Sequence, residues 1–298
     1  MFNWLNKIRL LNDNYPIFND CSKESCGEIN EVYFFAKGFL EKRYYKVNGL
    51  RGELLKIISG EKIPRTLKVK SKNYGITDLK DTGWTFLRIG SGWELVFKCG
   101  IPCPSHLGAH AHSDQLSFDL FYNGKPIIIE TGTSTYEKGF FRDFERSSRA
   151  HNTLQLGIKK SNKIIWHEPI DAWEIFRVGK KAIPLEKNYG QFNDWLWVQG
   201  SHNGFEKLGA SHFRRIAVKI KYDNSPIIII IDRIEINNNS LSLRSWLHFH
   251  KNFFDEANEF GGLEYQIYAS KQFFNKKRKY LNSYLSNGYD KREKRKSF

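Results

Sequence analysis

Residues 108–136 have the sequence GAHAHSDQLSFDLFYNGKPIIIETGTSTY, which contains the clearest local fold signal of the chain. The pair Asn123-Gly124 separates the largely apolar runs 118–122 and 127–129. Asn and Gly both tolerate the positive backbone φ angles of a two-residue turn, so the segment predicts an antiparallel β-hairpin.

The sequence on both sides of this hairpin has a similar texture. From Leu67 to about Phe254, short β-branched and aromatic runs are separated by Gly, Asn, Asp and Pro. Many such runs with turn residues between them indicate stacked antiparallel sheets. We therefore expect a mainly β fold, an antiparallel β-sandwich, over residues 65–270. The clearest runs are 84–89, 93–97, 127–129, 195–198, 216–220 and 227–231.

Residues 1–64 have a different pattern, which favours helices. Apolar or aromatic side chains recur at helical spacing over 32–40 and again over 50–58. Gly60 and Pro64 then end the pattern. We expect residues 1–64 to form a short helical segment ahead of the sandwich.

The composition limits the classes of protein to consider. The chain has 298 residues, 40% of them hydrophobic and 15% aromatic, which is enough for one large or two modest domains. It contains no apolar run of the roughly 18 residues that a membrane span needs. The start lacks the uninterrupted apolar stretch of a signal peptide, so we expect neither a membrane span nor an export signal in this sequence.

The net charge of +15 is concentrated at the C-terminal end. Residues 271–298 contain ten Lys or Arg and only two acidic residues, more than half of the excess. This distribution favours a solvated, disordered basic tail over a nucleic-acid-binding surface. We expect no nucleic-acid partner; binding through the tail would be abolished by its deletion and would fall steeply with salt.

Four cysteines occur at positions 21, 26, 99 and 103. Neither pair has the two-residue gap of a zinc knuckle. Cys99 and Cys103 are close enough in sequence to meet across a turn, but spacing alone does not establish a disulfide. The cysteines therefore do not indicate a redox compartment.

The window 108–153 gathers the residues that could carry chemistry. His110, His112 and His151 lie there with several carboxylates and Tyr136. Clusters of histidine and acid are how proteins hold a metal ion or move protons. A lone histidine in a β domain is more often structural, so the order and spacing of the whole set matter.

Three motifs in this window resemble the C-terminal domain of the heparinase II/III-like family, which includes oligoalginate lyases and other lyases of acidic polysaccharides. They are His110-x-His112-x-Asp114-x-x-Ser117, the run from Gly124 to Tyr136, and Arg146-Ser-Ser-Arg-Ala-His151-Asn152-Thr153. Weaker similarity extends the match over roughly residues 75–250. The resemblance implies a β-sandwich preceded by a large helical (α/α) toroid, of which residues 1–64 can supply only the last helices.

The resemblance also implies roles for individual residues. It makes His110 the catalytic histidine and His112, Glu130 and His151 the ligands of a structural zinc ion. Two imidazoles, a carboxylate and a water complete a tetrahedral zinc shell. Glu130 stands where many relatives carry Asp, which moves its oxygens by about one carbon bond, roughly 1.5 Å.

Strand geometry gives a separate test of the metal hypothesis. An ideal turn at Asn123-Gly124 pairs Ser117 with Glu130 and leaves His112 five residues away, about 16 Å along a straight strand. No metal spans that gap. The hypothesis therefore requires the chain to turn between His112 and Ser117, and a bulge near Pro126 to adjust the face of Glu130.

Other side chains in the window have candidate roles with structural alternatives. Arg142, Arg146 and Arg149 suit a uronate carboxylate or sulfate through paired donors, or equally surface ion pairs. Tyr136 is a substrate contact or proton shuttle, or else a core tyrosine. Asp114 and Asn152 would orient the histidines or serve as turn residues. Trp166-His167-Glu168 could form a saccharide-stacking edge, or hold a buried tryptophan.

The leading functional hypothesis is a polysaccharide lyase that cleaves uronate-containing glycans by β-elimination, with this chain as the sandwich half. The resemblance implies an acidic polysaccharide or oligosaccharide substrate, a helical toroid as further part or separate partner chain, and a periplasmic or extracellular location. The alternative is a sandwich that binds glycan without catalysis. No Gly-x-Ser-x-Gly elbow, phosphate loop or dinucleotide fingerprint supports another enzyme class.

Overall fold

The fold is described from a computed structural model. The structure describes residues 2–22, 25–65, 74–104, 106–172, 174, 176–222, 224–236, 241–251, 281–288 and 291–297. Helices α1 (Phe2–Ile8), α2 (Ser25–Glu41) and α3 (Gly49–Ser59) precede the strands, and α4 (Phe140–Arg146) lies within the β region. Short 3-10 turns occur at η1 (Leu11–Asp13), η2 (Ser148–Ala150) and η3 (Glu206–Leu208).

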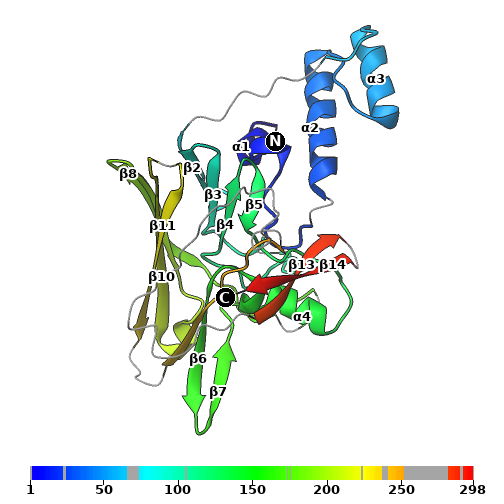
Figure 1. The fold of residues 1–298 in the computed structure, drawn as a ribbon. Coiled ribbons are helices and arrows are strands. Elements are labelled where there is room, and N and C mark those ends of the chain that lie inside the picture. Colours follow the sequence, from blue (N-terminus) through cyan, green and yellow to red (C-terminus); the bar gives the residue numbers. More distant parts are fainter. Residues whose placement is uncertain are drawn as a thin grey trace.

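The strands form antiparallel sheets, and the expected β-sandwich is confirmed (Figure 1). The first sheet has the order β1-β2-β3-β4-β5 and the second the order β11-β10-β9-β8. Smaller sheets have the orders β12-β6-β7 and β13-β14. The bounds are β1 Gly75–Leu79, β2 Trp84–Gly90, β3 Trp93–Lys98, β4 Phe118–Tyr122, β5 Lys125–Ile128, β6 Leu154–Lys160, β7 Lys163–His167, β8 Pro184–Phe192, β9 Trp195–His202, β10 Ala210–Ile220, β11 Pro226–Ile236, β12 Leu241–Ser245, β13 Leu281–Gly288 and β14 Lys291–Ser297.

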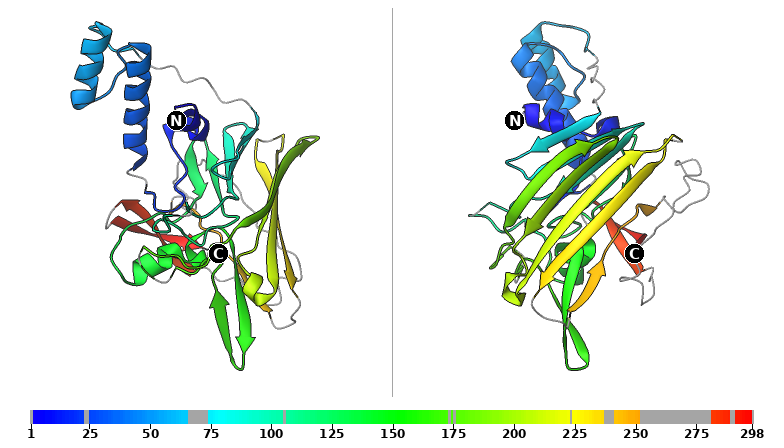
Figure 2. Two further views of the ribbon diagram at one scale, coloured as in Figure 1. Left: turned by 180° about the vertical axis from the view of Figure 1, so that it is seen from behind. Right: turned by 90° about the vertical axis from the view of Figure 1, so that its left-hand side faces the viewer.

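The two larger sheets enclose the main core. Leu95, Phe97 and Phe118 of the first sheet pack in one cluster with Val198 and Ile216 of the second. Along β10 buried residues alternate with more exposed ones, as expected for a strand with one face on a core. Figure 2 shows the two sheets as stacked layers. Removal of these side chains from water is the main force that holds the layers together.

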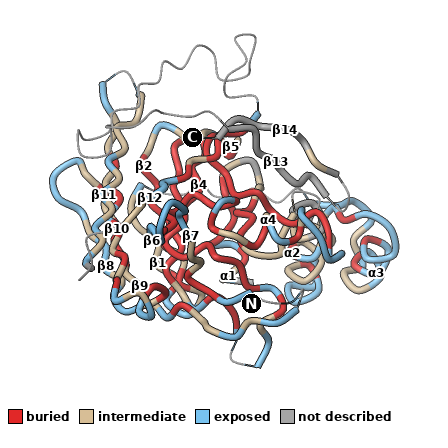
Figure 3. The backbone as a smooth tube through the Cα atoms, turned by 90° about the horizontal axis from the view of Figure 1, so that it is seen from below, coloured by how far each residue is buried: buried red, intermediate tan, exposed pale blue. Residues whose placement is uncertain are grey.

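The first sheet is buried on its other face as well. Helix α1 and the segment that follows it place Leu5, Ile8 and Phe18 against Phe86 and Val96. All six residues of β3 are therefore buried, and Figure 3 shows buried segments gathered around β2 and β4. This cover brings the segment around residue 20 alongside the ends of β3 and β4.

The helices α2 and α3 fall within the expected helical region, whereas α1 had no clear periodic signal. Helices α2 and α3 pack on each other and extend away from the sheets (Figure 1). Phe39, Leu50 and Ile57 are exposed on them. No helix among the described residues is long and apolar enough to cross a membrane.

One expectation from the sequence needs correction, and one question that the spacing left open has an answer. The tail was expected to be disordered over 271–298, but residues 281–288 and 291–297 form the β13-β14 hairpin. Residues 271–280, 289, 290 and 298 of the expected tail lie outside the described residues. Its Arg292 donates a hydrogen bond to Ser134 Oγ at 2.6 Å and stacks on the Phe141 ring, which docks the tail near α4. Cys99 and Cys103 are free thiols and form no disulfide with each other.

Candidate active site

The loop between β3 and β4 folds back on itself, as the metal hypothesis requires. Ser117 N donates to Asp114 O at 3.2 Å, and Leu116 adopts a positive φ of 59°. Leu116 N and Lys98 O, 3.0 Å apart, then begin the pairing that leads into β4. His112 and Ser117 therefore do not lie on one straight strand, and His112 returns toward the start of β4.

A bulge in the β4-β5 hairpin places Glu130. Phe121 pairs with Pro126, but Leu120 pairs with Ile128, so the register shifts by one residue between them. Beyond the bulge, Glu130 N donates to Asp119 Oδ1 at 2.9 Å. The Glu130 side chain is buried; Ser117 Oγ donates to its Oε1, and its Oε2 contacts His151 Nδ1.

His112 and His151 come together beside Glu130. Their ring centroids are 5.3 Å apart, and both side chains are buried. Burial lowers the pKa of His112 to about 4 despite its contact with Asp20. Burial also opposes charge on His151, but Glu130 outweighs it and raises the pKa of that ring. The described part of the chain gives no partner to His112 Nδ1 or to His151 Nε2.

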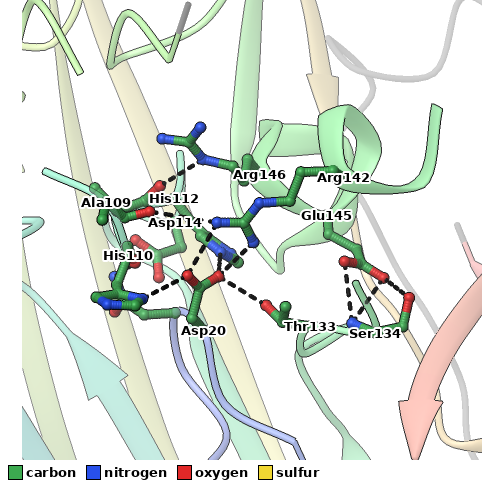
Figure 4. A network of polar contacts seen from close by, with 12 residues as sticks. Asp20, Ala109, His110, His112, Asp114, Thr133, Ser134, Arg142, Glu145 and Arg146 are labelled. Atoms are coloured by element: carbon green, nitrogen blue, oxygen red, sulfur yellow. Dashed lines mark hydrogen bonds and ion pairs between the residues drawn. The ribbon is translucent and has the colours of Figure 1, made fainter. Parts of the chain in front are cut away.

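Asp20 is the hub of the site, and sequence analysis missed it. It lies after α1, contacts His110 Nδ1 and His112 Nε2 at 2.7 Å each, and accepts from Thr133 Oγ1 at 2.9 Å (Figure 4). Arg142 binds both of its oxygens, one at 2.9 Å. Although burial favours the neutral acid, the hydrogen bonds from His112 and Arg142 hold the pKa of Asp20 well below its usual range.

The ionised Asp20 fixes which imidazole nitrogens carry protons. A carboxylate only accepts hydrogen bonds, so a neutral His112 has its N–H on Nε2 and its lone pair on Nδ1. For the same reason, a neutral His110 has its N–H on Nδ1 and its lone pair on Nε2. Carboxylates that orient histidines in this way are typical of metal and catalytic centres.

His110 and Tyr136 form the exposed part of the site. The His110 side chain is 52% exposed, and Tyr136 is 36% exposed. Their rings meet edge to face with centroids 6.2 Å apart. Arg142 lies 5.0 Å from the Tyr136 ring centroid, and the exposed Phe176 packs against that ring at 5.9 Å. Burial raises the pKa of Tyr136, so its hydroxyl is protonated at neutral pH.

The three arginines named as substrate contacts differ in the structure. Arg142 is 1% exposed and committed to Asp20 and to Ala109 O. Arg146 is also buried, with donors on Ala111 O and Glu174 O. We therefore reassign both from substrate contact to holding the 109–112 loop in place. Arg149 is exposed and lies 5.6 Å from the Phe144 ring centroid.

Asp114 and Asn152 are both buried, in different environments. Lys98 forms an ion pair with Asp114, whose negative charge acts on both His112 and His151. Within the described residues, Asn152 forms no hydrogen bond with the ring of His112 or His151. Instead its backbone N–H donates to Ser117 Oγ at 2.9 Å, and its side chain accepts from His248 N at 2.7 Å. Asn152 therefore connects Ser117, at the start of β4, to the segment that carries His248.

Arg214 on β10, to which sequence analysis gave no role, supports the site from the second sheet. It donates to Leu116 O at 3.0 Å and to Asn152 O, and is paired with Asp232. The buried His212 contacts Asp232 at 2.7 Å and His202 at 3.3 Å. His202 and His212 are thus structural.

A family model described as heparinase II/III-like, C-terminal, matches residues 71–279. The chain belongs to the heparinase II/III-like family. The matched range contains the His110, His112, Glu130 and His151 positions, whereas Asp20 lies outside it. No curated protein matches the chain.

Solved structures share the fold of this chain. A mutant of heparan sulfate lyase HepC from Pedobacter heparinus aligns with a TM-score of 0.62 and 16% identity, over 100% of this chain and 42% of that one. A heparinase III structure aligns with a TM-score of 0.60 and 15% identity, over 99% of this chain and 44% of that one. The chain therefore spans less than half the length of these family structures.

Proposed function

We propose that this chain is the β-sandwich part of a polysaccharide lyase that cleaves uronate-containing glycans by β-elimination. One observation carries the proposal: the exposed His110 and Tyr136 lie side by side over the buried Asp20, which orients His110. Solved structures of the same fold are named heparan sulfate lyase and heparinase III. Because such glycans are extracellular polymers, we also propose a periplasmic or extracellular location.

His110 and Tyr136 supply two of the functions that β-elimination needs. The reaction removes the C5 proton of a uronate and protonates the departing O4 oxygen. His110 can present its Nε2 lone pair to the sugar, while Asp20 holds the opposite nitrogen. Tyr136 keeps its hydroxyl proton at neutral pH and can donate a hydrogen bond to the same sugar.

Zinc at His112, Glu130 and His151 is part of the proposal. Within the described residues, no three His, Cys, Asp or Glu side chains are preassembled as a metal group. However, two imidazoles on one tetrahedral zinc ion at about 2.1 Å have ring centres roughly 5 Å apart, close to the 5.3 Å here. His112 Nδ1, which is buried and has no partner in the described part of the chain, also suits a cation. Such an ion would hold the two loops together and polarise nearby groups.

Elemental analysis of the protein purified without chelators tests the zinc site. We expect about one zinc per chain in the wild type and strongly reduced zinc in His112→Ala, because two remaining ligands bind zinc weakly. His106→Ala, an exposed histidine outside the cluster, should keep the wild-type content. A wild-type protein without any transition metal would contradict the site.

The described groups leave the uronate carboxylate without a dedicated cation, because Arg142 and Arg146 are committed inside the protein. Neutralisation of that carboxylate is needed to make the C5 proton acidic. We propose that a helical toroid, in a longer form of the protein or as a separate partner chain, supplies these groups.

The test is the ultraviolet absorbance of the unsaturated uronate product on heparan sulfate and on alginate. We expect little or no turnover by this chain alone, and a large increase when a complementing toroid domain is added. His110→Ala should then lower turnover by at least about a hundredfold, the usual contribution of a positioned acid or base. Rapid turnover by the chain alone would contradict the need for a toroid, and no product from the complemented protein would contradict lyase activity.

A non-catalytic glycan-binding role is the second candidate, favoured by the outer face of the second sheet. Arg215 lies 5.3 Å from the Trp197 ring centroid, and Lys219 lies 5.1 Å from that of Trp195. Cations held on aromatic rings can bind acidic sugars without any reaction. A carbohydrate array that shows binding, with no unsaturated product from the complemented protein, would identify this role.

A further inference from the structure

A flat aromatic platform lies at the base of the β6-β7 hairpin. Trp166 on β7 pairs with Gly157 on β6. A Cβ added at Gly157 would come within 2.9 Å of the Trp166 indole. The missing side chain therefore lets the indole lie across β6 toward β12.

Arg244 on β12 stacks on this platform. Strand β12 lies on the other side of β6 from β7, and Arg244 pairs with Gln155. The Arg244 guanidinium carbon lies 3.8 Å from the Trp166 ring centroid. A guanidinium stacked in this way keeps its N–H edge free for an anion and loses little conformational entropy on binding.

Arg149 brings a second positive charge to the same region. Ser148, which precedes it, donates to Glu168, and Glu168 accepts from Gln155, the cross-strand partner of Arg244. Burial and the charge of Arg149 both lower the pKa of Arg244. In the described ranges each arginine packs on an aromatic ring, and neither forms an ion pair or a side-chain hydrogen bond. Two like charges kept close together without a counter-ion are unfavourable by themselves, and a bound anion would remove that cost.

Glu168 anchors this region without neutralising it. Its Oε2 accepts from Ser148 N at 2.7 Å and from Ser148 Oγ. Its Oε1 accepts from Gln155 Nε2 at 2.8 Å. Glu168 thus links Ser148, which precedes Arg149, to Gln155, the cross-strand partner of Arg244. Because Glu168 directly follows β7, it also holds the end of the strand that carries Trp166.

We infer that Trp166, Arg244 and Arg149 form a subsite for an anionic group, a sulfate or a carboxylate, on the glycan that reaches His110. The inference rests on the proposed function, because it assigns this anion to the same substrate. Arg149 lies two residues before His151, on the segment that carries the buried histidine cluster. The subsite would therefore bind a sugar unit away from the reacting one.

Calorimetric titration of the full chain with acidic oligosaccharides tests the subsite. The probes are a sulfated uronate oligosaccharide, its desulfated form and an alginate oligosaccharide. For Arg244→Gln and Arg149→Gln we expect about five- to tenfold weaker binding of the preferred probe, the loss of one or two charge-assisted hydrogen bonds. Arg244→Lys should be intermediate, because it keeps the charge but not the stacked fork.

A matched control separates this subsite from the general positive charge of the protein. Arg51→Gln on α3 also removes one exposed arginine and should change affinity less than about twofold. A loss confined to the sulfated probe identifies a sulfate subsite, and an equal loss on all probes a carboxylate subsite. If the wild type binds but Arg149→Gln and Arg244→Gln behave like Arg51→Gln, the subsite is wrong while the proposed function stands. If the wild type binds no acidic probe, the subsite is wrong, and the product assay on the complemented protein decides the proposed function separately.

Discussion

Asp20 holds more of the site together through its side chain than any of the residues that the sequence motifs indicated. It contacts two imidazoles and pairs with Arg142, which is 1% exposed. Asp20→Asn would leave that guanidinium buried without a counter-ion, and we expect a loss of about 3 kcal/mol in the free energy of unfolding. Urea denaturation of both proteins at neutral pH measures the difference.

Asp171→Asn is the matched control, because Asp171 and Lys207 are 3.6 Å apart and 51% and 74% exposed. This control should lower the free energy of unfolding by less than about 1 kcal/mol. An equal loss in both variants would contradict the role of Asp20.

Glu130 and Asp20 show the limit of residue-level prediction. The family resemblance grouped His112, Glu130 and His151, but Asp20 precedes His110 by 90 residues with no pattern linking them.

Among the elements, β10 carries the side chain that connects the second sheet to the site. Its Arg214 binds Asp232 through two nitrogens and reaches the carbonyl groups of Leu116 and Asn152. Arg214→Lys keeps the charge but cannot make these contacts together, so we expect a loss of about 2–4 kcal/mol in stability. Thermal and urea unfolding of the variant measure it.

An exposed arginine on α3 provides the control. Arg51→Lys should change stability by less than about 0.5 kcal/mol. Similar losses in both variants would contradict this role of Arg214.

The hairpin next to this site was predictable because local chemistry determines it: Asn123 and Gly124 have φ angles of 48° and 72°. Arg214 was not, since its partners lie 98 and 62 residues away.

At the scale of the whole molecule, alternating short apolar runs were enough to predict a mainly β sandwich. The tail was harder, because its many Lys and Arg residues have the composition of a disordered segment. Strand pairing between 281–288 and 291–297 and the contact of Arg292 with Phe141 depend on tertiary structure, which composition does not report. The same reason explains why the sequence did not show that His202 and His212 form a buried histidine chain in the second sheet.

That histidine chain predicts how the stability of the molecule depends on pH. Burial lowers the pKa of His202 and His212 below the usual value, whereas both would titrate near about 6.5 in the unfolded chain. Below that pH the unfolded chain binds protons that the folded one does not. The stabilisation that these two neutral histidines contribute is therefore fully present above about pH 7. Acidification lowers the free energy of unfolding by up to about 1.4 kcal/mol per pH unit for each group.

His202→Asn isolates one of these groups, because an amide oxygen can replace the ring nitrogen that accepts from Gly204 N at 2.9 Å. Urea denaturation at several pH values between 7 and 5 should give a shallower slope for this variant than for the wild type. His106→Asn removes an exposed histidine and should leave the slope unchanged. Equal slopes in His202→Asn and the wild type would mean that His202 is not held neutral by the fold, and that the acid sensitivity arises elsewhere.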